Sequence, residues 1–285
     1  MQHTGYLSGR RRIDMEWSKA KSILIFLFAI LNIFLLSSIL WNESRSRPGA
    51  DYIKHVENLL ESRNIRIECK VPSYSADSGS VVYSDTSIDE TSVVDYFLGH
   101  DAADAGTGEK VWRNDGKVLE IGNNIIVFKD SSPDTGLDIG DSRAVSAELM
   151  KVLKGLGMKQ KDYVPDVWQE QDGRLHVRYV KKYMGQLLFD VYADFIVSSG
   201  GIECAAIVPG EVNHTLAESE ILSAWHILAL AKIRENSVIT DICFGYKRIN
   251  EGELYDSPVW RIRFSDGSEL FYNAYTGEEA AIGNT

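Results

Sequence analysis

The sequence predicts an α+β protein with a single apolar helix near its N terminus. Three observations support this prediction. An uncharged run, Ser22–Trp41, has the length and composition of a membrane helix. Beyond it, segments with apolar residues at helical spacing alternate with segments in which apolar and polar residues alternate one by one. Asp-Gly pairs separate several of these alternating segments, and such pairs favour tight hairpins between antiparallel strands.

The apolar run predicts a membrane anchor at 22–41. At about 1.5 Å per residue it reaches about 30 Å, the thickness of the hydrocarbon layer of a bilayer. Five basic residues precede it and two follow it: Arg10, Arg11, Arg12, Lys19 and Lys21, then Arg45 and Arg47. The positive-inside rule places the N terminus in the cytoplasm. We therefore expect a single-pass protein of the cell membrane, with a cytoplasmic tail at 1–21 and an extracytoplasmic C-terminal part.

A cleaved signal peptide also begins with a basic region and an apolar core. The core here is too long for one, no small-x-small cleavage site follows it, and no cysteine follows to accept a lipid. A retained anchor is the preferred interpretation. The start of translation is left open between Met1 and Met15, because Met15 directly precedes the segment where a compact anchor would begin.

Polar and aromatic residues of the anchor are the candidate partner-binding residues. Asn32 lies near the predicted bilayer centre, where its amide needs a partner on its own backbone or on another helix. A hydrogen bond between two membrane helices stabilises their association by about 0.6 to 2 kcal/mol. Trp17 is expected at the membrane interface. With Asn32 and Trp17, the pair Ser37 and Ser38 completes the predicted contact set.

The membrane-proximal part is predicted as one α+β unit at 52–132. Its helix-strand pattern opens after a linker at 42–51, and Asn64 is expected to stop the first helix in a left-handed conformation. A capping box at 87–90 starts the second helix. The expected elements are a helix at 52–62, a strand at 65–71, a helix ending at Gly99, and strands at 110–113, 118–121 and 125–128.

The membrane-distal part, 142–285, is predicted to repeat the same construction twice. A helix is followed by antiparallel strands joined by an Asp-Gly turn, and a capping box at 215–218 starts the last helix. Whether the exterior is one domain or two, with a boundary near 133–141, is left open. The expected elements are a helix at 143–156, strands at 163–170, 175–184, 187–197 and 202–208, a helix from the capping box to about Arg234, and strands at 238–246, 259–264 and 270–274.

Composition excludes some classes of partner. Beyond residue 47 the chain holds 23 basic and 38 acidic residues, a net charge near −15. This argues against nucleic-acid binding, which needs a basic surface, and against simple attraction to an anionic surface. The three cysteines, Cys69, Cys204 and Cys243, stand far apart in apolar strand-like contexts. Buried free thiols are favoured over one disulfide and a spare thiol.

No catalytic motif is present: there is no P-loop, no dinucleotide fingerprint, no nucleophile elbow and no zinc-protease helix motif. The histidines are scattered singly, and His226 beside Trp225 is interpreted as structural. Paired acids for glycan hydrolysis stay an alternative that sequence spacing does not address. Four tryptophans are interpreted as core residues first and as glycan-stacking residues second: Trp112, Trp168, Trp225 and Trp260.

One run has calcium-loop spacing: Asp130, Ser132, Asp134, Asp138 and Asp141. Thr135 stands where the loop needs glycine, Pro133 interrupts it, and a strand precedes it instead of a helix. A solvated linker is the preferred interpretation. The sequence thus predicts no catalytic residue, no cofactor and no metal site.

Two stretches resemble a known family. The start MEWSKAKSILIFLFAILNIFLL, with its mid-membrane Asn32, and the ending from Pro258 through Asp266-Gly267 to Glu278 resemble the YycI branch of the YycH/YycI family. The resemblance runs from Met15 to the C terminus. The ending also resembles the last hairpin of PepSY-type modules.

This resemblance implies an exterior of PepSY-like helix-plus-meander units and a non-enzymatic regulator. The implied partners are a YycH-like single-pass membrane protein and an essential sensor histidine kinase, within two-component signalling that controls cell-wall metabolism in low-GC Gram-positive bacteria. The family supplies no catalytic residues.

Two alternatives stay open, an envelope enzyme or PepSY-like inhibitor of a secreted protease, and an extracytoplasmic ligand sensor. Facing carboxylates in a cleft would favour the enzyme, and an exposed strand edge would favour a protein-binding role.

Overall fold

The computed structural model describes residues 17–45, 48–73, 78–84, 88–104, 110–122, 124–250 and 252–280. The chain forms two compact units, Met1–Arg47 and Pro48–Thr285. Each unit is described by itself.

The first unit consists of helix α1, Trp17–Arg45. The predicted anchor at 22–41 lies inside this helix, and the described side chains, those of residues 21–36, are all exposed. Among the residues whose side chains the structure describes, no helix has both the length and the apolar character needed to cross a membrane. The predicted linker at 42–51 is shorter than expected, because α1 continues to Arg45 and the next helix begins at Ala50.

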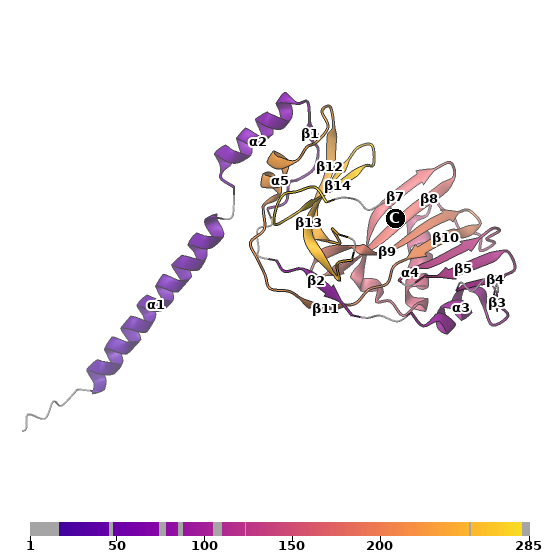
Figure 1. Ribbon diagram of the computed structural model, residues 1–285, viewed down its shortest axis with the longest axis horizontal. Coiled ribbons are helices and arrows are strands. Elements are labelled where there is room, and N and C mark those ends of the chain that lie inside the picture. Colours follow the sequence, from indigo (N-terminus) through magenta and orange to yellow (C-terminus); the bar gives the residue numbers. More distant parts are fainter. Residues whose placement is uncertain are drawn as a thin grey trace, which may run out of the picture. The chain divides into compact units, whose positions relative to one another are not determined.

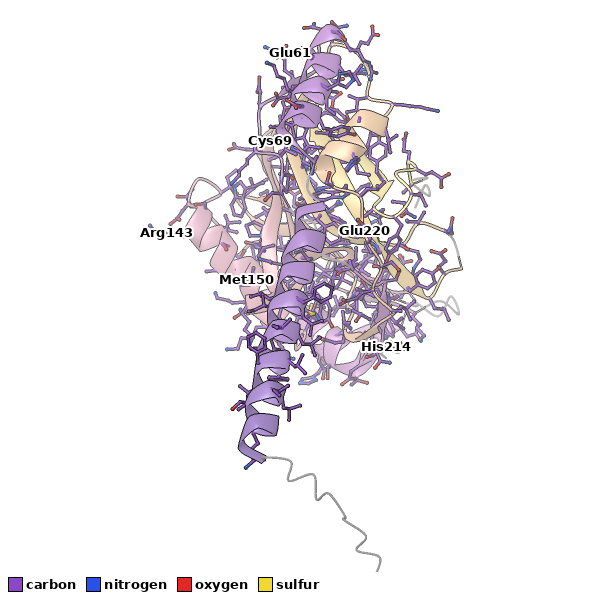
Figure 2. All side chains as sticks on the ribbon, turned by 90° about the vertical axis from the view of Figure 1, so that its left-hand side faces the viewer. Glu61, Cys69, Arg143, Met150, His214 and Glu220 are labelled. Atoms are coloured by element: carbon purple, nitrogen blue, oxygen red, sulfur yellow. The ribbon has the colours of Figure 1, made fainter. Side chains whose placement is uncertain are left out.

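Helices of the second unit begin and end largely where local signals predict. Asn64 follows α2 with a left-handed φ of 55°. Asp89 caps α3 by accepting from the Ser92 amide, and Asp141 caps α4 by accepting from Arg143 and Ala144. Figure 2 labels Arg143 and Met150 on α4. The helices are α2 Ala50–Ser62, α3 Glu90–Leu98, α4 Ser142–Gly155 and α5 Ala224–Leu230, with a short 3₁₀ turn η1 at Gln160–Asp162.

The described strands form one 14-stranded sheet with branches. Along its main path the order is β11-β2-β13-β12-β9-β10-β6-β5-β4-β3. In chain order the strands are β1 Arg66–Ile67, β2 Val81–Tyr83, β3 Ala103–Asp104, β4 Val111–Asn114, β5 Lys117–Ile121, β6 Ile126–Asp130, β7 Tyr163–Gln171, β8 Arg174–Tyr183, β9 Gln186–Ser198, β10 Gly201–Ile207, β11 Val212–Thr215, β12 Val238–Lys247, β13 Tyr255–Phe264 and β14 Glu269–Asn273.

The three predicted rounds of helix and antiparallel meander are present. They are α3 with β4–β6, α4 with β7–β10, and α5 with β12–β14. Two parallel contacts were not predicted: β1 with β12, and the start of β9 with the end of β12. Strand β9 is long enough to pair with β12 at Leu187 and Leu188 and with β10 from Ala193 onward. This strand therefore joins the last round to the earlier ones.

The described residues of the second unit form two large hydrophobic cores and a third, small cluster of Phe189, Val259, Phe271 and Ala280. Core 1 packs α2 and α5 against β12–β14, and core 2 packs α3 and α4 against β5–β10, an arrangement visible in Figure 1. Trp260 is the largest fully buried side chain of core 1, and its indole N–H donates to the Leu222 carbonyl at 2.8 Å. Both cores combine residues from the two predicted segments, 52–132 and 142–285.

The helix predicted from the capping box at 215–218 to about Arg234 is present only as α5, so its predicted start and end are wrong. Thr215 ends strand β11, and α5 begins only at Ala224, where the Ser223 hydroxyl accepts from the His226 amide. Residues 216–219 instead run beside 78–80, with the Leu216 amide bonded to the Ser80 carbonyl at 2.8 Å. Tertiary pairing thus overrides the local capping signal.

Two strands differ in length from the prediction. The strand expected at 65–71 has only Arg66 and Ile67 in its ladder, although Cys69 (Figure 2) still packs against core 1. Strand β13 begins four residues earlier than expected, at Tyr255, because its first residues pair with β2. Pro258 is tolerated there, and its carbonyl accepts from the Ala274 amide at 2.9 Å.

Candidate interaction surface

Strand β7 lies at an edge of the sheet. Among the described strands it pairs only with β8. The backbone groups on its other side therefore face away from the ladder, and such an edge is a template for pairing with another chain. The two halves of this strand differ in how far they are protected against pairing with another chain.

The first half of β7 carries two devices that discourage pairing. Pro165 has no N–H to donate to a neighbouring strand. The register with β8 shifts between Pro165 and Val167, which makes Asp166 the extra residue of a β-bulge. The bulge directs the Asp166 side chain toward strand β13.

Asp166 binds two arginines of β13. Arg261 donates two hydrogen bonds to its carboxylate, from Nη1 to Oδ2 at 2.8 Å and from Nη2 to Oδ1 at 2.7 Å. Arg263 adds a bond from Nη2 to Oδ2 at 2.9 Å. The side chains of Arg261 and Asp166 are only 3% and 7% exposed. This charged contact fixes the first half of β7 on the last meander.

Further groups complete the charge balance around Arg261. Its Nη2 lies 3.2 Å from Asp241, its Nη1 lies 3.6 Å from Glu269, and its guanidinium lies over the Phe189 ring at 4.8 Å from the centroid. Burial raises the pKa of Asp166, but the bonds from Arg261 and Arg263 outweigh burial and hold it below its usual value. The Asp166 carboxylate is therefore charged inside the protein, where losing a partner is costly.

The second half of β7, residues 167–171, has no such protection. Trp168 is 38% exposed although it stands opposite the buried Val177. Glu170 is the only charged residue of this half, and no lysine or proline interrupts it. Natural edge strands usually carry such gatekeepers. The unprotected half of β7 is therefore suited to accept a partner strand.

Next to this edge, the face of β8 and β9 opposite core 2 carries a charged cluster. Asp194 accepts from Arg178 Nη2 at 2.5 Å and lies 2.5 Å from His176 Nε2. Arg178 also lies over the Tyr192 ring at 5.0 Å from the centroid. Burial lowers the pKa of Arg178, but the Asp194 carboxylate outweighs burial and raises it above its usual value. The cluster holds rigid polar groups beside the free edge.

The His176–Asp194 pair can be compared with the His-Asp pair of hydrolases. A His-Asp pair in a hydrolase orients the histidine toward a nucleophile. Here the residues opposite His176 on the two neighbouring strands are Gln169 and Ile196, and neither is a nucleophile. Asp194 is instead shared with Arg178, as in a structural cross-strand pair.

The residues of the predicted helix contact lie in the first unit. The side-chain amide of Asn32 donates to the Phe28 carbonyl of its own helix at 2.8 Å. Trp17, Ser37 and Ser38 belong to α1, and their side chains lie outside the described residues. A helix-helix contact through these residues stays a prediction.

The calcium-like run is used for local turns and a helix cap. Asp130 Oδ1 accepts from the Ser132 amide, Asp138 Oδ1 accepts from the Gly140 amide, and Asp141 caps α4. Within the described residues, no group of three or more acidic, histidine or cysteine side chains is placed to hold a metal ion.

Other predicted residues have structural roles. His226 Nδ1 lies 2.9 Å from the Ser223 hydroxyl and its ring contacts Tyr52. The three cysteines are free and partly buried, and burial raises the pKa of the Cys243 thiol to about 12. Trp112 and Trp225 pack partly against the two cores, Trp260 is buried, and Trp168 departs from the core prediction because it lies on the free edge.

One feature of the sequence does mark this edge, although the strand was predicted without it. A proline inside an alternating run, as at Pro165, marks an edge strand or a bulge. The partners of Asp166 were not predictable in this way, because Arg261 lies 95 residues further along the chain.

Comparison with known proteins shows which folds the chain resembles and to which family it belongs. No curated protein matches the sequence. Solved structures similar to it include an uncharacterized protein from Eubacterium rectale ATCC 33656, with 15% identity, 80% of this chain and 99% of that chain covered, and a TM-score of 0.49. The Bacillus megaterium YpeB C-terminal domain has 12% identity, with 69% of this chain and 96% of that chain covered and a TM-score of 0.42.

YycH from Bacillus subtilis shares 13% identity with this chain, with 78% of this chain and 61% of that chain covered and a TM-score of 0.53. This similarity shows a shared fold over less than two thirds of the YycH structure. The sequence itself matches the model of the YycI protein family over residues 45–275. Because that match covers most of its length, the chain belongs to the YycI family.

Proposed function

We propose that the chain is a non-enzymatic, membrane-anchored regulator of two-component signalling in the YycFG system, where it binds a YycH-like protein and the sensor histidine kinase. The observation that carries this proposal is the family match over residues 45–275. The family is a regulatory one and not a family of enzymes. Through this signalling system the chain would take part in the control of cell-wall metabolism.

The proposed location is the cell membrane, with the N terminus in the cytoplasm and the unit Pro48–Thr285 outside. The excess of basic residues before the apolar run supports this orientation. An anchor confines the protein to two dimensions and raises its effective concentration near a membrane partner. Weak contacts then suffice for assembly.

Two contacts are proposed with these partners. In the membrane, the bond from Asn32 to Phe28 uses one of the two N–H donors of the amide group, and a partner helix would engage the rest of that group. Outside, residues 167–171 of β7 would pair with an extended segment of the partner ectodomain by β-augmentation. The protected first half of β7 would fix the register.

The test is a crosslinking pull-down from native membranes with the full-length chain. The variants are Asn32→Leu and a chain with 22–41 replaced by an unrelated membrane helix, and the control is Ile33→Leu on the same helix. We expect a YycH-like protein and a histidine kinase with the intact chain and the control, and reduced recovery with both altered anchors.

A different result would support the rival class. If no membrane partner is recovered and the purified protein cleaves wall material or holds a secreted protease, the regulatory proposal is wrong. If partners are recovered equally with every variant, the regulator stands but the anchor contributes no specific contact.

A further inference from the structure

A buried aspartate joins strand β13 to a two-stranded ribbon formed by β2 and β11. Asp256 is 0% exposed and stands opposite Val81 of β2 in the register. The Tyr83 hydroxyl donates to Asp256 Oδ2 at 2.5 Å. The ribbon is thus attached to β13 by backbone pairing at Tyr255 and Asp256 and by the bond from Tyr83 to the Asp256 carboxylate.

Bonding of this carboxylate is incomplete. Asp256 Oδ1 has no hydrogen-bond donor among the described residues, and its ion-pair partner, Arg248 Nε, lies 3.6 Å away. Four charged or titratable groups face Asp256: Tyr83 from β2, Asp190 from β9, Lys247 from β12 and Arg248 after β12. A buried carboxylate with an unbonded oxygen and a second carboxylate nearby favours its protonated form.

One of the two cations of this group, Lys247, is paired with Asp190, which also accepts a bond from the backbone. Lys247 Nζ lies 2.6 Å from Asp190 Oδ1, and the Arg248 amide donates to Asp190 Oδ2 at 2.7 Å. Lys247 and Arg248 therefore offset the negative charge of Asp256 only in part. Burial and, to a smaller extent, the charge of Asp190 raise the pKa of Asp256 to about 6, against the opposing effects of the Tyr83 bond, Arg248 and Lys247.

The ribbon and its connection to β10 are packed closely around Tyr83. A Cβ added at Gly210 would lie 2.7 Å from Val191 Cγ2 and 3.4 Å from the Tyr83 ring. The Gly210 carbonyl also accepts from the buried Lys181 Nζ at 2.6 Å. Release of Tyr83 from Asp256 would therefore loosen the segment that leads from core 2 to core 1.

We propose that Asp256 is a proton-operated catch that holds the β2–β11 ribbon on β13 more tightly in acid than at neutral pH. In the attached state Asp256 keeps its proton up to about pH 6, whereas in an opened state it would titrate near 3.8. The attachment is therefore fully stabilised below the lower value and weakens as pH rises through about 6. This inference does not depend on the proposed regulatory function.

Hydrogen exchange of the full-length chain in lipid nanodiscs tests the catch. Exchange is measured at pH 5.0 and 7.5 and corrected for the intrinsic pH dependence of amide exchange. Amides of 81–83 and 212–215 should be protected about tenfold more at pH 5.0, from a pKa difference of about two units of which this interval covers one. Asp256→Asn should give the high protection at both pH values, while the control Glu120→Gln on β5 should respond like the wild type.

Persistence of the tenfold change in Asp256→Asn would overturn the proposal. If that variant does not fold, Tyr83→Phe decides, because it removes the donor that favours the charged carboxylate. The pH midpoint of ribbon protection should then move upward, and an unmoved midpoint would equally overturn the proposal.

Discussion

At the scale of single residues, the Asp166–Arg261 contact is the most consequential one in the second unit. It joins residues 95 positions apart, and both side chains are almost fully buried. Buried ion pairs add little net stability compared with apolar residues, but removing one partner leaves an uncompensated charge. Arg261 already has one buried group, Nε, with no hydrogen-bond partner among the described residues. Loss of a further hydrogen-bond partner of Arg261 should therefore be costly.

Asp166→Asn should lower the free energy of unfolding by about 3 to 5 kcal/mol, because Arg261 keeps its charge in a buried site. The double variant Asp166→Leu with Arg261→Met should recover most of this loss. Urea unfolding of the full-length chain at pH 7 provides the measurement. Lys151→Ala, which removes an exposed ion pair with Glu148, is the control and should leave the midpoint unchanged. Equal small effects of Asp166→Asn and the control would contradict this account.

At the scale of elements, strand pairing is controlled by small features of individual strands. On β7, a proline and a bulge protect one half and leave the other half free. On β12, Gly245 allows the parallel approach of β9, because a Cβ there would lie 2.5 Å from the Leu187 carbonyl oxygen and 2.6 Å from the Phe189 ring. The first feature governs contact with other chains, and the second governs the joining of two meanders.

Gly245→Ala should destabilise the protein by about 1 to 3 kcal/mol, since backbone of β9 must move to accept the methyl group. The control is Gly49→Ser, where no atom lies within 4 Å of the added Cβ and serine is a favoured helix N-cap. The melting temperatures of both variants, measured by thermal unfolding, test this prediction. An unchanged melting temperature for Gly245→Ala would mean that β9 and β12 are not held at this distance in solution.

Trp168→Lys should weaken binding of a YycH-like ectodomain to the full-length chain by about tenfold or more. A lysine on the free half of β7 adds the charge that natural edges use against pairing and removes an exposed aromatic anchor. Leu254→Lys is the matched control, because Leu254 is 81% exposed and belongs to the connection between β12 and β13 and not to β7. A titration in nanodiscs gives both affinities. Equal affinities for the two variants would remove β7 from the interface.

At the scale of the whole molecule, local signals predicted most elements but not how they assemble. The alternation from Tyr163 to Ile207 and the caps at Asp89 and Asp141 act within a few residues, so the sequence displays them directly. The extended course of 216–219 depends on pairing with residues about 140 positions earlier, as in the bridge Ser78–Ser219. The free edge of β7 and the bonds of Asp166 likewise depend on which strands become neighbours. Assembly information of this kind is not present in any short window.

The way in which the two cores are joined leads to a last prediction. Strand β9 supplies Leu188 and Val191 to core 1 and Phe195 to core 2, so the intact second unit should unfold as one cooperative body. Its direct pairing with β12 is limited to two residue pairs, and the Asp166–Arg261 contact is a second bridge. In Asp166→Asn the uncompensated charge lies on β13, a strand that contributes Trp260 and Ile262 to core 1. Native-state hydrogen exchange should therefore show equal opening free energies for β8 and β12 in the wild type. In the variant β12 should open at a lower free energy than β8, and an equal fall in both strands would show that β9 alone couples the cores.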